Sequence, residues 1–329
     1  MSAPTRTMRA ALVTAYEGPA ALVVREVGEP EHDADAVRIS VHAAGITFPD
    51  LLATRGLYQV KPPLPFAPGL EVAGIVLDAP DGSAFAPGDR VAAFLTFGGL
   101  AEVVSVDPAH VVPLPDEVGF VDGAALVVNH LTAHFALTKR GELRPGQTVL
   151  VHGAAGGLGT ASVQVARACG AEVIAVASSD VKARLARDCG AHEVVSPGGF
   201  LDAVRRLTGG RGVDIVVDPV GGDRVTDSLR ALAPEGRLLV LGFASGEIAS
   251  VRTNRLLLGN SGVLGVAWAE YVRLRPAYFA EQWADLLPRI VSGQLQPMVR
   301  TTYPLAEAAD ALRAIETRTA IGKLVIDLT

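Results

Sequence analysis

The sequence predicts an α/β fold in two parts, an irregular β-rich domain and a doubly wound parallel-sheet domain. Residues 148–159 read Thr-Val-Leu-Val-His-Gly-Ala-Ala-Gly-Gly-Leu-Gly, an apolar run that ends in a glycine-rich turn. Apolar and amphipathic runs then alternate as far as Val266. The N-terminal third instead contains short β-rich runs punctuated by glycine and proline, which is typical of an all-β domain rather than of βαβ units.

The glycine-rich turn fits a strand–turn–helix unit that binds the pyrophosphate of a dinucleotide. Glycines permit a tight turn and a close approach of the phosphate, and the first N–H groups of a helix attract negative charge. Taken alone, the pattern also fits an ordinary tight turn. The candidate cofactor contacts in this A-x-x-G-x-G turn are Ala154, Gly156, Gly157, Leu158 and Gly159.

Further apolar runs predict the other strands of a parallel sheet that is covered on both faces. Lys182–Cys189 is interpreted as a helix between two of these strands. This strand–helix rhythm predicts a Rossmann domain over residues 125–265. The predicted strands are Glu172–Ala177, Val213–Val217, Arg237–Leu241 and Val263–Val266.

The rest of the chain predicts a second, β-rich domain. After Trp268 the pattern becomes mixed, with an amphipathic helix over Leu305–Arg318 and a final strand over Gly322–Leu328. We expect residues 266–329 to pack back and complete the domain formed by residues 1–124. The β-rich runs of the N-terminal third are Ala10–Val13, Val37–Val41, Glu71–Leu77, Arg90–Phe94 and Ala101–Val106.

Composition narrows the classes of partner. The chain has 329 residues, enough for two cores, and a net charge of −6 without a basic patch, which argues against nucleic acid as a partner. No continuous apolar stretch is long enough to span a bilayer, and the N-terminus lacks the apolar core of a signal peptide. The two cysteines cannot form a disulfide framework. We therefore expect a cytoplasmic protein without a membrane partner, by default.

Several ordered segments have the sequence and spacing of one known family. They are Ala43–Asp50, Gly56–Tyr58, Pro68–Gly74, Pro87–Val91, Asn129–Ala133 and Ala320–Asp327. With these segments the chain resembles the quinone oxidoreductase (zeta-crystallin-like) branch of the zinc-free medium-chain dehydrogenase/reductase superfamily. The resemblance implies a GroES-like catalytic domain, a Rossmann domain that binds NADPH, and reduction of quinones or α,β-unsaturated carbonyls. It also implies a homodimer formed by edge pairing of two Rossmann sheets. The apolar run Ser261–Trp268 is the candidate edge, and an edge covered by its own chain is the alternative.

Two positions argue against a catalytic zinc. Zinc alcohol dehydrogenases of the same superfamily use Cys and His ligands, and the positions resembling them hold Thr47 and Leu70. Zinc needs thiolate, imidazole or carboxylate ligands, which leucine cannot supply. We expect no bound metal. The family usually has asparagine where Thr47 stands, so Thr47 is a candidate with altered polar contacts to the nicotinamide.

The end of the second predicted strand favours NADPH. NAD enzymes usually place Asp or Glu there, on the ribose 2′-hydroxyl. Here Ser178 and Ser179 follow the strand, and their hydroxyls can donate to a 2′-phosphate, while Lys182 supplies charge one turn later. A solvated surface lysine is the alternative for Lys182. We expect Asp180 to cap the following helix and to point away. Arg318 resembles an arginine near the family's C-terminus and is a further cofactor candidate.

The remaining site candidates serve the substrate and the nicotinamide. Tyr58 is the candidate hydrogen-bond donor to the substrate, although a loop tyrosine without a catalytic role fits equally well. Thr132 is a nicotinamide-side candidate and Asn129 a candidate that orients a neighbour. The residues expected to line the cofactor site are Gly242, Phe243 and Trp268. Ordinary packing is the alternative for Phe243 and Trp268.

Alternative functions remain at this point. A short-chain dehydrogenase needs Tyr-x-x-x-Lys, and none of the five tyrosines has lysine four residues later. An enoyl-thioester reductase acting on coenzyme A or carrier-protein substrates shares the predicted architecture. A low-turnover NADPH-binding structural or sensor protein is a third possibility. The physiological substrate and the proton donor are not predicted, because loops build the mouth of such a pocket.

Overall fold

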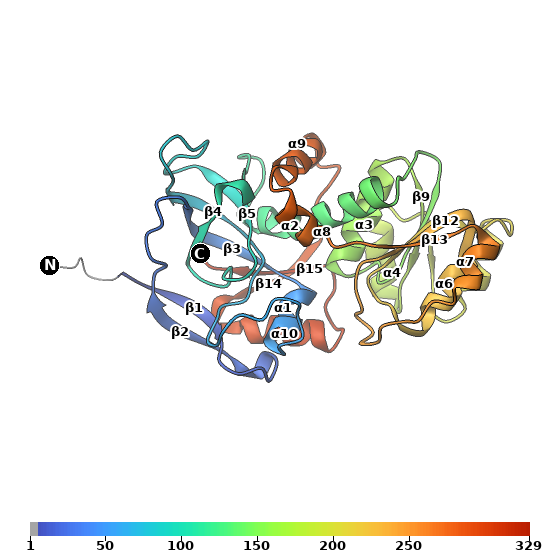
Figure 1. Cartoon of the computed structure of the whole chain (residues 1–329), viewed down its shortest axis with the longest axis horizontal. Helices are drawn as coiled ribbons and strands as arrows, with labels where there is room; N and C mark the ends of the chain where they lie inside the picture. The colour runs from blue at the N-terminus through green and yellow to red at the C-terminus, as the bar shows by residue number, and fades with distance from the viewer. Residues whose placement is uncertain (1–5) are drawn as a thin grey trace. The chain divides into compact units, whose positions relative to one another are not determined.

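The computed structural model describes residues 6–329, which form two units (Figure 1). The β-rich unit combines the N-terminal part of the chain, up to Val128, with Arg275–Thr329. The parallel-sheet unit comprises Asn129–Leu274. The predicted α/β fold class, with one β-rich part and one doubly wound part, is confirmed.

The parallel-sheet unit contains six parallel strands in the order β10-β9-β8-β11-β12-β13. The chain runs outward from β8 in both directions, so a topological switch point lies between β8 and β11, where ligands bind in sheets of this kind. The strands are β8 (Thr148–Val151), β9 (Glu172–Val176), β10 (Glu193–Val195), β11 (Val213–Asp218), β12 (Leu232–Val240) and β13 (Gly262–Gly265).

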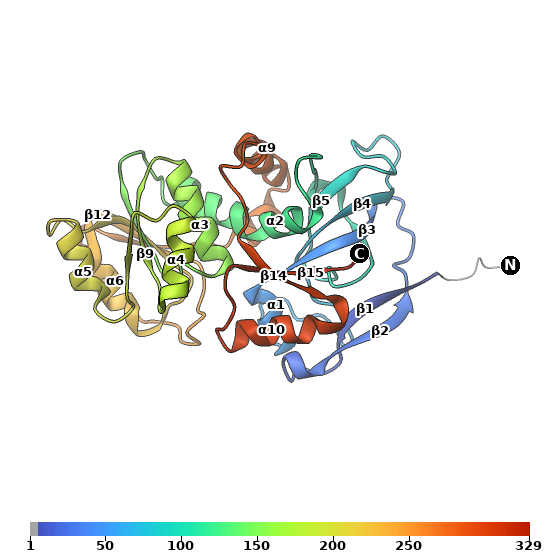
Figure 2. The ribbon, with the colours of Figure 1, turned by 180° about the vertical axis from the view of Figure 1, so that it is seen from behind.

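Helices cover both faces of this sheet. Figures 1 and 2 show α3 and α4 along one face and α5 and α6 along the other. Leu150, Val216 and Leu238 are fully buried, which explains why these strands are apolar throughout. The helices are α3 (Gly157–Ala168), α4 (Asp180–Asp188), α5 (Phe200–Leu207), α6 (Val225–Ala231), α7 (Thr253–Gly259) and α8 (Trp268–Leu274).

The start of α4 corrects one prediction. Asp180 does not cap this helix but is its first residue, and Ser179 is the N-cap. The Ser179 hydroxyl oxygen accepts a hydrogen bond from the Lys182 backbone N–H at 3.4 Å. Serine and aspartate are both good caps, and the extended backbone at Ser179 (φ −154°) decides between them.

The β-rich unit is built on a sheet with the strand order β14-β15-β3-β4-β5-β7, in which β6 also pairs with β3. The C-terminal strand β15 lies between β14 and β3, so both ends of the chain contribute to one sheet. A separate two-stranded sheet joins β1 to β2. The strands are β1 (Thr7–Val13), β2 (Leu22–Gly28), β3 (Val37–Ile46), β4 (Glu71–Asp78), β5 (Arg90–Phe94), β6 (Val103–Val106), β7 (Val111–Pro113), β14 (Val299–Pro304) and β15 (Lys323–Asp327).

Four α-helices accompany this sheet: α1 (Phe48–Thr54), α2 (Phe120–His134), α9 (Ala277–Val291) and α10 (Ala308–Glu316). Helix α2 continues across the division of the chain into Asn129–His134 and then into a π-helical turn, Phe135–Arg140. Phe120–Arg140 has the length and hydropathy of a membrane span, but 72% of its apolar window is buried inside the protein, as in a core helix. The predicted Leu305–Arg318 helix is shorter, because its first residues form a 3-10 turn, Leu305–Glu307.

Candidate functional site

The glycine-rich turn joins β8 to α3 at the carboxyl edge of the parallel sheet. Gly156 is the N-cap of α3 and supplies no side-chain cap. Within residues 6–329, no backbone acceptor bonds the N–H groups of Gly157, Leu158 and Gly159. The first N–H groups of a helix carry partial positive charge and bind phosphate when nothing else satisfies them. The turn can therefore accept a pyrophosphate.

Gly159 lets α3 begin very close to the preceding turn. A Cβ atom at this position would lie 2.1 Å from the Gly153 carbonyl oxygen and 2.7 Å from the Ala154 Cα. No side chain fits at such distances. A Cβ at Gly156 would come no closer than 3.6 Å to any neighbour, so Gly156 faces open space. A ligand can therefore approach the backbone of Gly156 closely. At Gly159, glycine is needed because α3 packs closely against the turn.

Loops from neighbouring strands gather at the same edge. The Ala154 N–H donates to the carbonyl of Val176, the last residue of β9, at 3.3 Å. Gly242 and Phe243 follow β12, and the Ala244 N–H donates to the Pro219 carbonyl at 3.1 Å, which joins the loops after β11 and β12. Phe243 is 39% exposed. Trp268 begins α8 and is buried, which fits a packing role as well as the predicted cofactor contact.

The polar residues predicted to bind a 2′-phosphate follow β9. Ser178 and Ser179 are exposed and Lys182 is half-buried. The Ser179 hydroxyl oxygen only accepts in its cap contact, so its proton stays available for a ligand. Asp180 starts the helix beside them with an exposed side chain.

In the β-rich unit, Thr47 and Tyr58 both lie near the buried carboxylate of Asp50. The Thr47 hydroxyl donates to Asp50 Oδ2 at 2.5 Å, and Asp50 also accepts from the Thr47 and Gly69 N–H groups. Burial raises the pKa of Tyr58, and the negative charge of Asp50 adds to this shift. Tyr58 is therefore a protonated donor at neutral pH, whereas Thr47, with its proton engaged, can only accept.

A buried ion pair that contacts the residue before Thr47 was not predicted. Lys323 Nζ donates to Glu71 Oε1 and, at 2.9 Å, to the Ile46 carbonyl, the residue before Thr47. Glu71 Oε2 accepts from the Val128 N–H at 2.6 Å. Burial raises the pKa of Glu71, and the charge of Lys323 opposes that shift. The sequence signalled this pair only through the presence of a charged residue, Lys323 or Glu71, within an otherwise apolar predicted strand.

His152 ends β8 directly before the turn and is fully buried. Its Nε2 lies 2.8 Å from Ser228 Oγ, and its ring meets Phe200 edge-on. Burial lowers the pKa of His152 to about 4. A neutral, buried imidazole without solvent access supports the turn rather than taking part in chemistry.

The predicted site residues divide between the two units. Thr47, Tyr58 and Arg318 belong to the β-rich unit, and Arg318 follows α10 with a left-handed φ of 59°. Asn129 and Thr132 lie one turn apart on α2, in the parallel-sheet unit. Across residues 6–329, no group of three or more His, Cys, Asp or Glu side chains is arranged to hold a metal. Leu70, in the position resembling a zinc ligand, is buried.

Comparison with known proteins identifies relatives along the whole chain. Residues 33–116 match the alcohol dehydrogenase GroES-like domain, and residues 157–291 match the zinc-binding dehydrogenase family. Quinone oxidoreductase-like protein 2 of Rattus norvegicus is 41% identical over 98% of this chain and 93% of its own length. Quinone oxidoreductase of the same organism is 33% identical over 99% of both chains. A mycobacterial protein solved in complex with NADPH is 32% identical, with a TM-score of 0.91 over 98% of this chain and all of that one.

Proposed function

Since the chain belongs to the quinone oxidoreductase branch of the medium-chain dehydrogenase/reductase superfamily, we propose that it is an NADPH-dependent oxidoreductase that transfers hydride to quinones or α,β-unsaturated carbonyls without a metal. The observation that carries the proposal is the uncapped glycine turn at the switch point, with Gly159 packed against Gly153. A pyrophosphate matches the free N–H groups of this turn in charge and in geometry.

The preference for NADPH rests on the residues after β9. Two exposed hydroxyls, Ser178 and Ser179, stand where NAD enzymes place a carboxylate, and Lys182 adds a positive charge. A terminal carboxylate would repel a 2′-phosphate, whereas these groups can donate to it. The NADPH bound by the mycobacterial relative supports the same cofactor here.

The chain's own residues stabilise charge on the acceptor. Bound NADPH supplies the hydride. Negative charge then develops on the acceptor oxygen, and the protonated hydroxyl of Tyr58 can donate to it. The Thr47 hydroxyl donates its proton to Asp50, so its oxygen can only accept a hydrogen bond, from an amide or hydroxyl group of a ligand. Thr47 and Leu70 in the positions resembling zinc ligands support metal-free chemistry, in which a quinone or enone spreads the charge itself.

Steady-state oxidation of NADPH tests the proposal against a panel of a benzoquinone, an enone, an enoyl-CoA and no acceptor, with ethanol oxidation measured in reverse. We expect turnover with the quinone or the enone. Turnover with the enoyl-CoA alone would favour an enoyl-thioester reductase, and no turnover with any acceptor would favour a binding protein. Brisk ethanol oxidation alone would refute the reaction class.

Tyr58→Phe tests the donor within the same assay. We expect kcat/KM to fall about tenfold or more, the loss of one transition-state hydrogen bond. Tyr303→Phe is the matched control, because this half-buried tyrosine of the same unit has a hydroxyl without a hydrogen-bond partner among the described residues. Equal rates in the two variants would remove Tyr58 from the mechanism and leave the reaction class intact.

We also propose that the protein is a homodimer joined at β13. Among residues 6–329 this strand pairs only with β12, and it forms one edge of the six-stranded sheet. Leu257 and Leu258 on the preceding helix α7 are 77% and 83% exposed. Pairing of two β13 strands would extend the sheet and cover an edge that otherwise favours aggregation.

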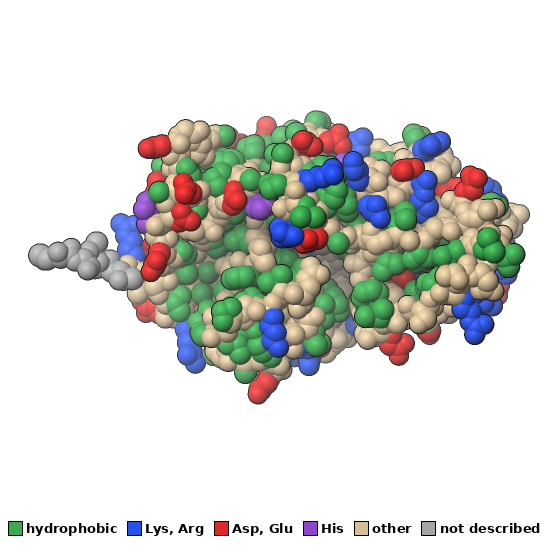
Figure 3. Space-filling view, in the orientation of Figure 1, with side chains coloured by type: hydrophobic (Ala, Val, Ile, Leu, Met, Phe, Trp, Pro, Cys, Tyr) green, Lys and Arg blue, Asp and Glu red, His purple; other side chains and the backbone are tan. Residues whose placement is uncertain are grey.

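Cys169 and Cys189 form no disulfide in the described part of the chain, which supports a reducing compartment, and we propose the cytoplasm. On the face of the molecule in Figure 3, basic and acidic side chains are interspersed. With the net charge of −6, this distribution supports a small-molecule partner rather than a nucleic acid.

A further inference from the structure

Asp218 is the last residue of β11, so it stands at the carboxyl edge of the parallel sheet, beside the topological switch point. Its side chain is only 1% exposed. Asp218 Oδ1 accepts hydrogen bonds from the N–H groups of Val220 at 2.8 Å and Gly221 at 2.9 Å. Within residues 6–329 this carboxylate forms no ion pair. Because a buried carboxylate is costly unless it is well bonded, these contacts define its role, which is to hold the loop after β11.

The loop that Asp218 holds lies against the glycine-rich turn. Val220 Cγ2 is 3.3 Å from the position that a Cβ atom at Gly153 would occupy, and Pro219 Cγ is 3.8 Å from it. Gly153 belongs to the turn between β8 and α3, whose free N–H groups can accept a pyrophosphate. The loop after β11 therefore borders the proposed pyrophosphate site.

The loop after β12 is built on the loop that Asp218 holds. The Ser245 N–H donates to the Val220 carbonyl at 2.8 Å. Gly221 has a left-handed φ of 68°, and a Cβ atom there would lie 3.1 Å from Phe243 Cδ1. The backbone of Gly221 thus packs against the ring of Phe243, a predicted cofactor contact. The position of Phe243 depends in this way on the two hydrogen bonds of Asp218.

The strand order relates these loops to one half of the dinucleotide. Sheets of this kind bind one mononucleotide on each side of the switch point. The residues proposed to bind the 2′-phosphate follow β9, so the side formed by β8, β9 and β10 would hold the adenosine half. The side formed by β11, β12 and β13 is left for the nicotinamide half, and both loops that depend on Asp218 belong to it.

We propose that Asp218 is a positioning residue of the cofactor site, which holds the loops after β11 and β12 in the arrangement that binds the nicotinamide half of NADPH. Because its side chain is buried, Asp218 acts through Val220, Gly221 and Phe243. This inference rests on the proposed NADPH site. Asp218 should accordingly govern the affinity for the whole dinucleotide and not the affinity for its adenosine half.

Calorimetric titration of the full-length protein with NADPH and with 2′,5′-ADP, an adenosine fragment that lacks the nicotinamide nucleotide, separates the two halves. Asp218→Ala removes the acceptor of both N–H groups. We expect it to raise the Kd of NADPH about tenfold or more, the effect of losing a hydrogen bond to a charged group. The Kd of 2′,5′-ADP should stay nearly unchanged. Asp218→Asn keeps an oxygen that can accept from both N–H groups, so it should restore most of the NADPH affinity.

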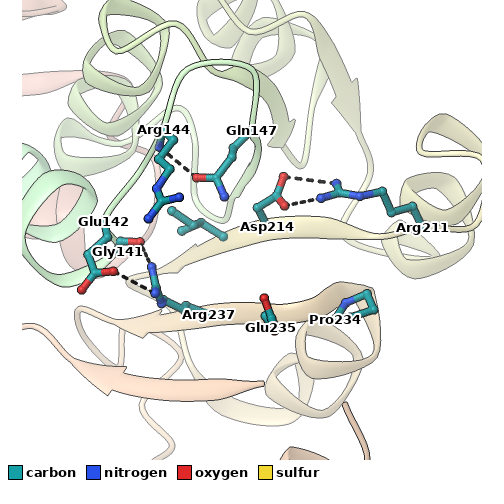
Figure 4. A pocket seen from close by; sticks show the side chains of 10 residues that line it. Gly141, Glu142, Arg144, Gln147, Arg211, Asp214, Pro234, Glu235 and Arg237 are labelled. Atoms are coloured by element: carbon teal, nitrogen blue, oxygen red, sulfur yellow. Dashed lines mark hydrogen bonds and ion pairs between the residues drawn. The ribbon is translucent and has the colours of Figure 1, made fainter. Parts of the chain in front are cut away.

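Asp214→Ala is the matched control. Asp214 lies at the other end of β11, is 8% exposed, and accepts a hydrogen bond from the Thr148 N–H at 2.7 Å. Figure 4 shows its bonds with Arg211, at 2.5 and 3.2 Å. Loss of these contacts should lower Tm, yet NADPH binding should be unchanged at a temperature where the variant is folded. The control therefore separates general destabilisation from the positioning of the two loops.

Gly221→Ala disturbs the same loop without removing Asp218, since its Cβ would press on Phe243 from a left-handed backbone. It should show the same selective loss of NADPH binding, and it replaces Asp218→Ala if that variant does not fold. Equal losses for NADPH and 2′,5′-ADP, or NADPH binding like that of the unchanged protein, would overturn this inference alone. An unchanged protein that does not bind NADPH would refute the proposed function and this inference with it.

Discussion

Replacing Gly159 with alanine tests the close packing that lets α3 begin at the turn. The new methyl carbon would lie 2.1 Å from the Gly153 oxygen and 2.7 Å from the Ala154 Cα, both backbone atoms that cannot swing aside. Because non-bonded carbon atoms pack at roughly 3.5–4.0 Å, the turn and the helix must separate by about 1 Å.

Overpacking of this kind costs about 1–3 kcal/mol, and a domain of this size loses about 2–4 °C of Tm per kcal/mol. The same displacement moves the Gly157, Leu158 and Gly159 N–H groups away from a bound pyrophosphate. We therefore expect NADPH binding to weaken about tenfold or more, as when a charged hydrogen bond is lost.

Gly156→Ala is the matched control for this prediction. Its Cβ would meet its nearest neighbour, the Gly153 oxygen, at 3.6 Å, which is an ordinary contact, and its φ of −86° suits alanine. A less favourable helix cap should cost below about 1 kcal/mol. Thermal unfolding of both variants decides the matter, because a Cβ at Gly156 enters the space left for a ligand and so cannot serve as a control for NADPH binding. If Gly159→Ala melts like Gly156→Ala, the close-packing explanation is wrong.

Four further outcomes are expected. Lys182→Ala should weaken NADPH binding, measured by titration, and leave NADH binding nearly unchanged. Lys139→Ala, at an exposed lysine of the same unit, is the control. Equal effects on both nucleotides would contradict the 2′-phosphate contact. Burial holds the pKa of His152 at about 4, below its usual 6.5, so the unfolded chain binds more protons between these values and the free energy of unfolding falls with decreasing pH. At 1.36 kcal/mol per pH unit this loss totals about 3 kcal/mol, and urea unfolding at pH 7 and 4.5 should show a smaller difference for His152→Gln than for the unchanged protein. Val266 donates to Val240 on β12, so by alternation the Val263 N–H faces the free edge, and Val263→Pro should convert the dimer to monomers in sedimentation; an unchanged dimer would place the interface elsewhere. EDTA should leave the NADPH oxidation rate unchanged, and a loss that zinc restores would refute metal-free chemistry.

The parallel-sheet unit could be predicted because its signals are local. Apolar runs such as Val213–Val217 are buried on both faces, and the glycine turn stands directly after the first of them. Strand β14 (Val299–Pro304) was not predicted, because its sequence Val-Arg-Thr-Thr-Tyr-Pro is mostly polar and its side chains are mostly exposed. Helix α9 was not predicted either, and it contains Pro288 in its last turn, a residue that usually ends a helical pattern.

The unpredicted part of the candidate site depends on contacts between distant segments. Lys323 and Glu71 are 252 positions apart and meet only because β15 pairs with β3 and β3 pairs with β4. The sequence identifies both strands but not their register. Thr47 was expected to contact the nicotinamide, and the engagement of its hydroxyl proton by Asp50 follows from the local capping box at the start of α1.

The insertion of β15 between β14 and β3 has a consequence for biosynthesis. The parallel-sheet unit is complete once Leu274 leaves the ribosome, whereas the β-rich unit lacks a central strand until Asp327 has been made. The nascent chain therefore carries an unpaired strand edge at Ala43–Ile46 while the parallel-sheet unit is already able to fold. An open strand edge of this kind recruits other chains. Premature termination after Leu274 should accordingly leave one folded domain attached to an aggregation-prone one.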